Sequence, residues 1–217
     1  CVGDSFTVGL GSPIQHTWCH VLSETIGRRV INVSMDGASN QWISRMASAI
    51  IQSLDPVNIV IMWSYTHRRE HADISWSDED RRLMASDCTA DQDLEMFVRC
   101  YKEVAEYSNT NVIHLAVPGF HRNSVATIWR QIRGDQWPEQ PPLSVNELHA
   151  LPTWILHEIQ HVHGCHDDIV QAIKVVSLCR DINVSEIVRS DVSRDGHHFD
   201  LATSEQIASL VQPLIQS

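Results

Sequence analysis

Hydrophobic and polar positions follow two kinds of pattern along this chain. Short apolar runs rich in β-branched residues predict buried strands. They lie at 1–2, 30–33, 57–63 and 112–117. The last two runs are apolar on both faces, so we expect central strands with helices on each side. Helical spacing of apolar residues predicts helices over about 40–53 and 91–107. Strands that alternate with helices are typical of an α/β fold with a parallel sheet.

Two further helices are predicted from the signals at their ends. Ser12-Pro13 favours a helix start and Gly27 favours a helix stop. The apolar face of that helix, at spacing i, i+4, i+8, comprises Trp18, Leu22 and Ile26. Further along, Thr203 and Gln206 form a capping-box pattern that opens a last helix. Its predicted core stripe comprises Ile207, Leu210, Val211 and Leu214.

The size of the chain favours a single domain. Its 217 residues are 43% hydrophobic and 20% charged, which is ordinary globular usage. We therefore expect one domain over 1–217, with irregular insertions near 71–92 and 134–147. No apolar run approaches the roughly 20 residues of a membrane-spanning helix, so we expect a soluble protein without a membrane span.

The net charge and the cysteine pattern argue against several kinds of partner and binding site. A net charge of −11 argues against nucleic acid as a partner, because phosphate binding needs clustered Lys and Arg. The six cysteines are scattered without a C-x-x-C, so neither a zinc ribbon nor a disulfide framework is indicated. We expect most of them to be small buried hydrophobes. The chain begins at Cys1 with no visible signal peptide, and we expect that its N-terminus has been trimmed.

The chemistry is concentrated in two short motifs at opposite ends of the chain. Gly3-Asp4-Ser5 lies where the first strand gives way to a loop, which is where open α/β sheets bind ligands. A serine is a weak nucleophile unless a neighbouring base takes its proton. Asp195 and His198 supply a candidate, because a carboxylate three residues before a histidine can fold back to its Nδ1–H.

These motifs resemble the SGNH, or GDSL-type, family of serine esterases and lipases. The resemblance covers nearly the whole chain, since a glycine at Gly37 follows the second strand and a further block follows the third. It implies a flavodoxin-like three-layer α/β/α sandwich around a parallel sheet of about five strands. It also implies that Ser5 is the nucleophile, His198 the general base and Asp195 its orienter. The backbone N–H groups of Ser5 and Gly37 would then form the oxyanion hole.

The third block departs from the family pattern G-x-N-D. Thr66 falls near the position of the family's Asn and offers a hydroxyl, while Asn40 or Arg68 could supply a side-chain donor instead. Asn40 could also cap the helix that follows it. Arg68 either pairs with Glu70 or holds an anionic group of the substrate. The W-S-x-x-x-R-x-E form resembles SGNH-like proteins of marine phages and bacteria. Its altered donor motivates an alternative hypothesis, a non-catalytic carbohydrate-binding or structural protein on the same scaffold.

A rival constellation fits H-E-x-x-H, a zinc-hydrolase pattern. His157 and His161 would lie on one helix face, with Glu158 beside the bound water and Asp167 as a third ligand. Two observations weigh against zinc. With 13 histidines a chance match to the motif is far from negligible, and the strands read as parallel and buried. We predict a solvated helix face here, and neither a metal nor an organic cofactor.

The combined prediction is a serine hydrolase that cleaves esters through an acyl-serine intermediate. The expected substrate is a short acyl ester, or an O-acetyl group on a carbohydrate. Trp76 and Trp137 lie in the irregular segments, where exposed rings could stack on sugar faces.

Overall fold

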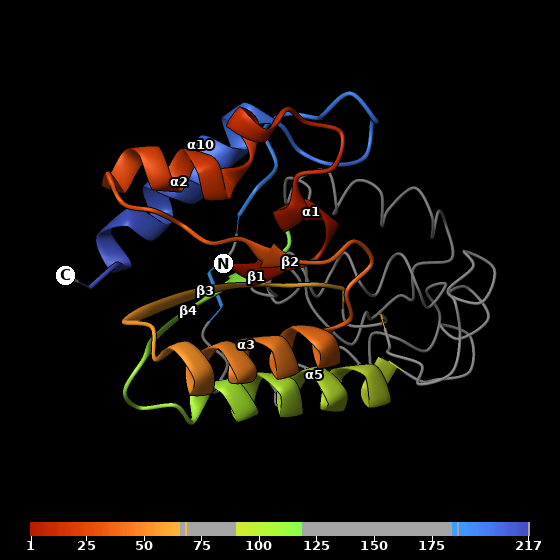
Figure 1. Cartoon of the computed structure of the whole chain (residues 1–217). Helices are drawn as coiled ribbons and strands as arrows, with labels where there is room; N and C mark the ends of the chain where they lie inside the picture. Colours follow the sequence, from red (N-terminus) through yellow and green to blue (C-terminus); the bar gives the residue numbers. More distant parts are fainter. Residues whose placement is uncertain (66–67, 69–89, 119–183, 186, 217) are drawn as a thin grey trace, which may run out of the picture.

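A parallel sheet forms the centre of the fold (Figure 1). The computed structural model describes residues 1–65, 68, 90–118, 184–185 and 187–216. Its strands are β1 (Val2–Gly3), β2 (Val33–Ser34), β3 (Asn58–Trp63) and β4 (Asn111–Ala116). Their order is β2-β1-β3-β4, and every pair is parallel. This order is that of a flavodoxin-like sheet, so the predicted fold class is confirmed.

The register of the sheet fixes which strand ends meet. Val2 lies opposite Val33 on one side and Ile61 on the other, so β1 is flanked by β2 and β3. On the outer side of β4, Ser185 forms a parallel bridge to Leu115. The described residues therefore hold four strands, and the bridge at Ser185 extends the sheet beyond β4, close to the predicted five.

Helices cover both faces of the sheet. In the described residues, the α-helices are α1 (Ser5–Val8), α2 (Trp18–Ile26), α3 (Asn40–Leu54), α5 (Ala90–Ala105) and α10 (Leu201–Val211). Short 3-10 turns are η1 (Ile14–His16) and η3 (Gln212–Leu214). Figure 1 shows α2 and α10 on one face and α3 and α5 on the other. The three-layer architecture follows from this arrangement.

The core divides into two layers because side chains of a strand alternate between its faces. In β3, Ile59 and Ile61 pack toward α3 and α5, whereas Val60 and Met62 pack toward α2 and α10. Large buried residues on the α2 and α10 side include Trp18, Phe6, Leu22, Leu115 and Ile207. Two apolar faces on one strand explain why its sequence is continuously hydrophobic.

Two cysteines belong to this core, as expected. Cys19 and Cys100 are both buried. Desolvation raises the pKa of the Cys19 thiol to about 12 and that of Cys100 to about 11. Both therefore behave as small hydrophobic residues with protonated thiols.

Helix α2 starts later than the signal at Ser12-Pro13 predicted. Ser12-Pro13 precedes only the 3-10 turn, because Pro13 is extended with ψ 150°. The helix begins at Trp18, where the hydroxyl of Thr17 accepts a hydrogen bond from the N–H of His20 at 3.4 Å. Gly27 ends it in the left-handed conformation with φ 62°, as predicted. β2 likewise starts at Val33, three residues later than expected.

The capping box predicted for the last helix is wrong. α10 begins at Leu201, so Thr203 lies inside its first turn. The hydroxyl of Thr203 donates to Asp191 at 2.5 Å, and Asp191 also accepts the N–H of Ala202 at 2.6 Å. A distant carboxylate thus caps this helix in place of a local one. The predicted stripe holds at Ile207 and Val211, but Leu214 is 44% exposed.

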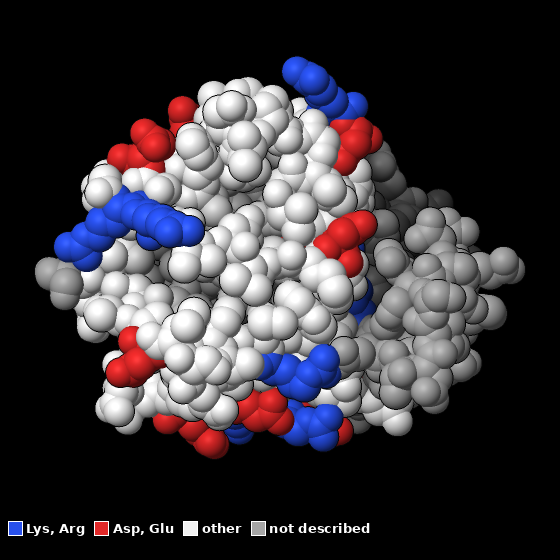
Figure 2. Space-filling view, viewed as in Figure 1, with Lys and Arg blue, Asp and Glu red and all other residues white. Residues whose placement is uncertain are grey.

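The described surface carries charges of both signs. On the face in Figure 2, Lys and Arg side chains lie among Asp and Glu around the edge, and its middle is uncharged. Within the described residues, no helix has the length and apolar character needed to cross a membrane.

Candidate active site

Ser5 lies at the carboxyl end of β1, where the strand order reverses. In such sheets the crevice beyond the strand ends is the usual ligand site. Asp4 caps α1, because its Oδ1 accepts the N–H of Phe6 at 3.0 Å. Gly3 is required by close packing, since a Cβ there would lie 2.1 Å from the hydroxyl of Thr7. The tight turn from β1 into α1 therefore sets the position of Ser5, which is 3% exposed.

The second part of the site is the loop before α10. The Nδ1 atom of His198 lies 2.6 Å from Oδ2 of Asp195. Oδ1 of Asp195 accepts three hydrogen bonds, from the Ser193 hydroxyl at 2.6 Å and from the N–H groups of His197 and His198 at 2.9 Å. Partial desolvation raises the pKa of Asp195, but these hydrogen bonds outweigh it and hold that pKa well below its ordinary value. Asp195 is therefore a carboxylate near neutral pH.

The two ends of the chain meet at this point. The ring of His198 lies 4.6 Å from that of Phe6, the residue after Ser5. A Cβ on Gly11 would lie 2.6 Å from the carboxyl of Asp195, and Gly11 has φ 77°, so only glycine suits this contact. Ser5, Asp195 and His198 are thus drawn from opposite ends of the sequence into one region.

One ring nitrogen of His198 is left over. Its Nε2 is buried and has no hydrogen-bond partner among the described residues, while Nδ1 is held by Asp195. A buried polar atom without a partner is rare and often marks a functional group. Nε2 therefore forms no hydrogen bond with the Ser5 hydroxyl in this structure, and it is open to a proton donor.

Gly37 lies in the turn that follows β2, the strand that pairs with β1. Its φ of 68° is in the left-handed region, which explains the glycine. The N–H groups of Ser5 and Gly37 are not hydrogen-bonded to any described residue. The two amides follow β1 and β2, which are paired in the sheet.

Asn40 holds the end of β3. Its Oδ1 accepts the N–H of Ser64 at 2.8 Å, and its Nδ2 donates to the carbonyl oxygens of Ser64 at 3.0 Å and Tyr65 at 3.3 Å. The residue that caps α3 is Ser39, whose hydroxyl accepts the N–H of Trp42 at 3.2 Å. The suggestion that Asn40 is the cap is therefore wrong. Its buried amide group is bound to the backbone after β3.

Arg68 has a partner that sequence reasoning missed. Its Nη1 lies 2.8 Å from Oδ2 of Asp4 and 3.1 Å from the Ser64 hydroxyl. Its guanidinium also stacks over the ring of Tyr65 at 5.1 Å. The sequence does show an acidic residue, Asp4, directly before the candidate nucleophile. Arg68 lies 64 positions further on, so spacing in the sequence could not identify it as the partner. Glu70, the predicted partner, lies outside the described residues.

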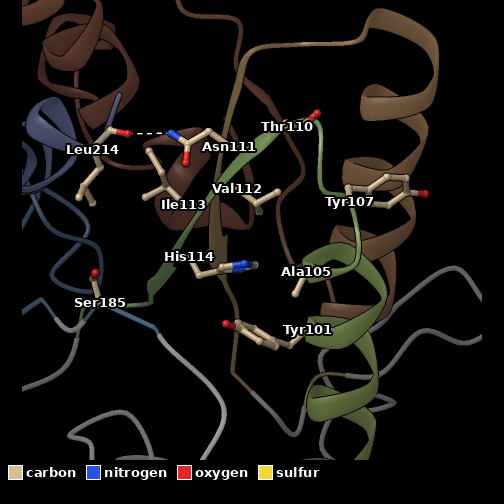
Figure 3. Close-up of a pocket in the computed structure, with 10 residues that line it drawn as sticks. All are labelled: Tyr101, Ala105, Tyr107, Thr110, Asn111, Val112, Ile113, His114, Ser185 and Leu214. Atoms are coloured by element: carbon tan, nitrogen blue, oxygen red, sulfur yellow. Dashed lines mark hydrogen bonds between the residues drawn. The ribbon is translucent and has the colours of Figure 1, made fainter. Parts of the chain in front are cut away.

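A separate pocket of about 390 Å³ lies beside β4 and α5 (Figure 3). The side chain of His114 lines it, and Nδ1 of that ring accepts a hydrogen bond from Trp63 Nε1 at 3.1 Å. Burial lowers the pKa of His114 to about 4, so the ring is neutral at pH 7. The pocket includes Thr110 and Asn111 at the amino end of β4. Ser5 lies at the other end of the parallel strands, beyond the carboxyl end of β1.

Several predicted site residues lie outside the described part of the chain. They are Thr66, the zinc candidates His157, Glu158, His161 and Asp167, and the tryptophans Trp76 and Trp137. The insertions near 71–92 and 134–147 also fall there, except for the residues from Ala90, which begin α5.

Comparison with known proteins supports the fold. No family model and no curated protein matches this sequence. Among solved structures, the crystal structure of TesA matches with a TM-score of 0.52 and 14% identity, over 99% of this chain and 96% of that one. The chain shares the fold of TesA. At 14% identity this likeness concerns the fold alone, and it agrees with the strand order and the three layers described above.

Proposed function

We propose that this protein is a serine hydrolase that cleaves esters through an acyl intermediate on Ser5. His198 acts as the general base and acid, and Asp195 orients its ring. The amides of Ser5 and Gly37 bind the oxyanion. No step of this reaction calls on a metal or an organic cofactor.

The observation that carries the proposal is the state of His198. Its Nδ1 is bound to a carboxylate at 2.6 Å, and its buried Nε2 has no partner among the described residues. The ring packs against Phe6, directly after Ser5. A purely structural histidine would gain stability by pairing both nitrogens, because a buried unpaired nitrogen is costly. We take the open nitrogen as the proton acceptor that the reaction needs.

The reaction then proceeds in two halves. Nε2 of His198 takes the proton of the Ser5 hydroxyl as Oγ attacks the ester carbonyl carbon. The carbonyl oxygen becomes an oxyanion, which the two amides stabilise. The intermediate collapses as His198 returns the proton to the leaving alcohol, and an acyl-Ser5 ester remains. Water, activated by His198, attacks that ester and releases the acid and free Ser5.

The proposed substrate is an ester of a short acyl group. O-acetyl groups of a carbohydrate are the preferred natural form of this class.

Hydrolysis of a chromogenic acetate ester tests the proposal. We would compare wild type, Ser5→Ala and His157→Ala, each with and without a chelator. We expect hydrolytic activity to fall by about 10³-fold or more in Ser5→Ala and to be unchanged in His157→Ala. We also expect the chelator to leave the activity of the wild type unchanged. Activity that survives in Ser5→Ala, or that disappears on chelation and in His157→Ala, would exclude it. Absence of both turnover and labelling of Ser5 by a fluorophosphonate would favour the non-catalytic scaffold.

A further inference from the structure

A fully buried carboxylate directly precedes Ser5. Asp4 has no solvent exposure, and its Oδ1 accepts the N–H of Phe6 at 3.0 Å. Its Oδ2 accepts the hydroxyl of Ser64 at 2.7 Å and Nη1 of Arg68 at 2.8 Å. One oxygen of Asp4 therefore sets the turn that carries Ser5, and the other faces the end of β3.

The charge of Asp4 needs a counter-charge. A carboxylate removed from water is strongly disfavoured unless it is paired and hydrogen-bonded. Among the described residues, Arg68 is the cation that forms an ion pair with it. The Arg68 side chain is 22% exposed, so the ion pair is screened only in part. Ser64 adds a neutral hydrogen bond, which does not compensate the charge.

The same contacts join two strand ends. Ser64 follows β3, and its backbone is held by the amide of Asn40 at the start of α3. Its hydroxyl reaches across to Asp4, which follows β1. Arg68 bonds to both Asp4 and Ser64 and so closes the cluster. The turn at Ser5 is thus held from the side of β3, in the block where this chain departs from G-x-N-D.

We propose that Arg68 is a positioning residue for Ser5. Its guanidinium neutralises Asp4 and so keeps the turn from β1 into α1 in the geometry that aims the Ser5 hydroxyl and amide. The inference rests on the proposed role of Ser5 as nucleophile. It assigns Arg68 to the turn that carries the nucleophile, and it leaves binding of an anionic substrate group as the competing role.

The test is a charge-rescue experiment with Arg68→Gln, Asp4→Asn and the double variant. In Arg68→Gln, Asp4 remains as a buried charge without its counter-ion, and the turn shifts to relieve it. Misplacement of the nucleophile lowers kcat by about 10²-fold, with KM for the acetate ester nearly unchanged. Asp4→Asn keeps an oxygen that accepts the N–H of Phe6. We therefore expect the double variant to regain about tenfold in kcat over Arg68→Gln.

Two controls make the result specific. Arg28→Gln removes an exposed arginine that forms no ion pair with a described residue, and it should leave kcat unchanged. Rates would be measured per active site, by fluorophosphonate titration, at a temperature below the unfolding midpoint of every variant. A merely structural role would lower that midpoint but leave the kcat of folded molecules intact.

The outcomes separate this inference from the proposed function. Wild-type kcat in Arg68→Gln, or no rescue in the double variant, overturns the positioning role while the esterase function stands. A rise in KM confined to anionic esters, at constant kcat, would assign Arg68 to substrate binding instead. An inert wild type whose Ser5 is not labelled would overturn the proposed function first, and the positioning role with it.

Discussion

Asp195 gathers four hydrogen-bonding contacts on one carboxylate. Three go to Oδ1 from its own loop, and Oδ2 remains for Nδ1 of His198. The three bonds to Oδ1 hold the carboxylate in place independently of its contact with the ring. The orientation of His198 therefore depends on the loop around Asp195 as well as on the bond to Nδ1. At the residue scale, the proposed function therefore depends on how rigidly Asp195 is held.

Asp195→Asn should lower kcat for the acetate ester by about 10³ to 10⁴-fold, because an amide can stabilise the wrong tautomer of His198. The expected loss falls on kcat, measured by steady-state hydrolysis. Asp200→Asn is the matched control, since Asp200 forms a similar contact at 2.7 Å with His16. Equal losses in both variants would show that an Asp–His pair at this end of the chain matters only for folding.

At the scale of elements, α10 depends on a cap that is distant in sequence. The carboxylate of Asp191 accepts the N–H groups of Asp200, Ala202 and Thr203, at 3.1, 2.6 and 3.2 Å. Desolvation raises the pKa of Asp191, but these bonds and the Thr203 hydroxyl outweigh it, so the pKa is lowered. The negative charge also suits the positive end of the helix dipole.

Asp191→Ala should lower the free energy of unfolding by about 1 to 2 kcal/mol at pH 7, the usual value of a helix cap. Because the folded pKa of Asp191 is lowered, its stabilisation is present above the ordinary pKa of 3.8 and is lost as pH falls through the folded pKa. Urea unfolding at pH 7, 5 and 3 should show the gap to wild type narrowing at the lowest pH. Glu205→Ala, on the exposed side of α10, is the control. A gap that is constant with pH would contradict the cap.

At the scale of the whole molecule, the last helix packs on the first long one. α10 and α2 lie side by side on one face of the sheet (Figure 1), with Ile207 and Trp18 in a common core. This packing also brings the loop of Asp195 and His198 to the turn after β1. The same contacts that stabilise the fold therefore assemble the candidate active site.

Ile207→Ala should destabilise the protein by about 2 to 5 kcal/mol, because Ile207 is fully buried and its loss leaves a cavity. Leu214→Ala, 44% exposed, should change stability by less than about 0.5 kcal/mol. Chemical unfolding of both variants provides the measurement. Similar losses at the two positions would mean that α10 is not anchored through Ile207.

Patterns over a few residues of sequence were enough to predict the elements and contacts that depend on neighbouring residues. The apolar runs located β3 and β4 to within a residue or two, because a strand buried on both faces must be continuously hydrophobic. The three-residue spacing of Asp195 and His198 was enough to predict their contact, since one turn of backbone joins them.

Only the tertiary structure decided which side chains far apart in sequence become partners. The start of α10 depends on Asp191, and the charge beside Ser5 depends on Arg68. Sequence reasoning offered nearer partners, Thr203 and Glu70, because local contacts are the ones that spacing can rank. Asp4 is buried, so its charge needs a cation that lies nearby in the folded chain. That cation is Arg68, which follows β3, the strand that the sheet order places beside β1.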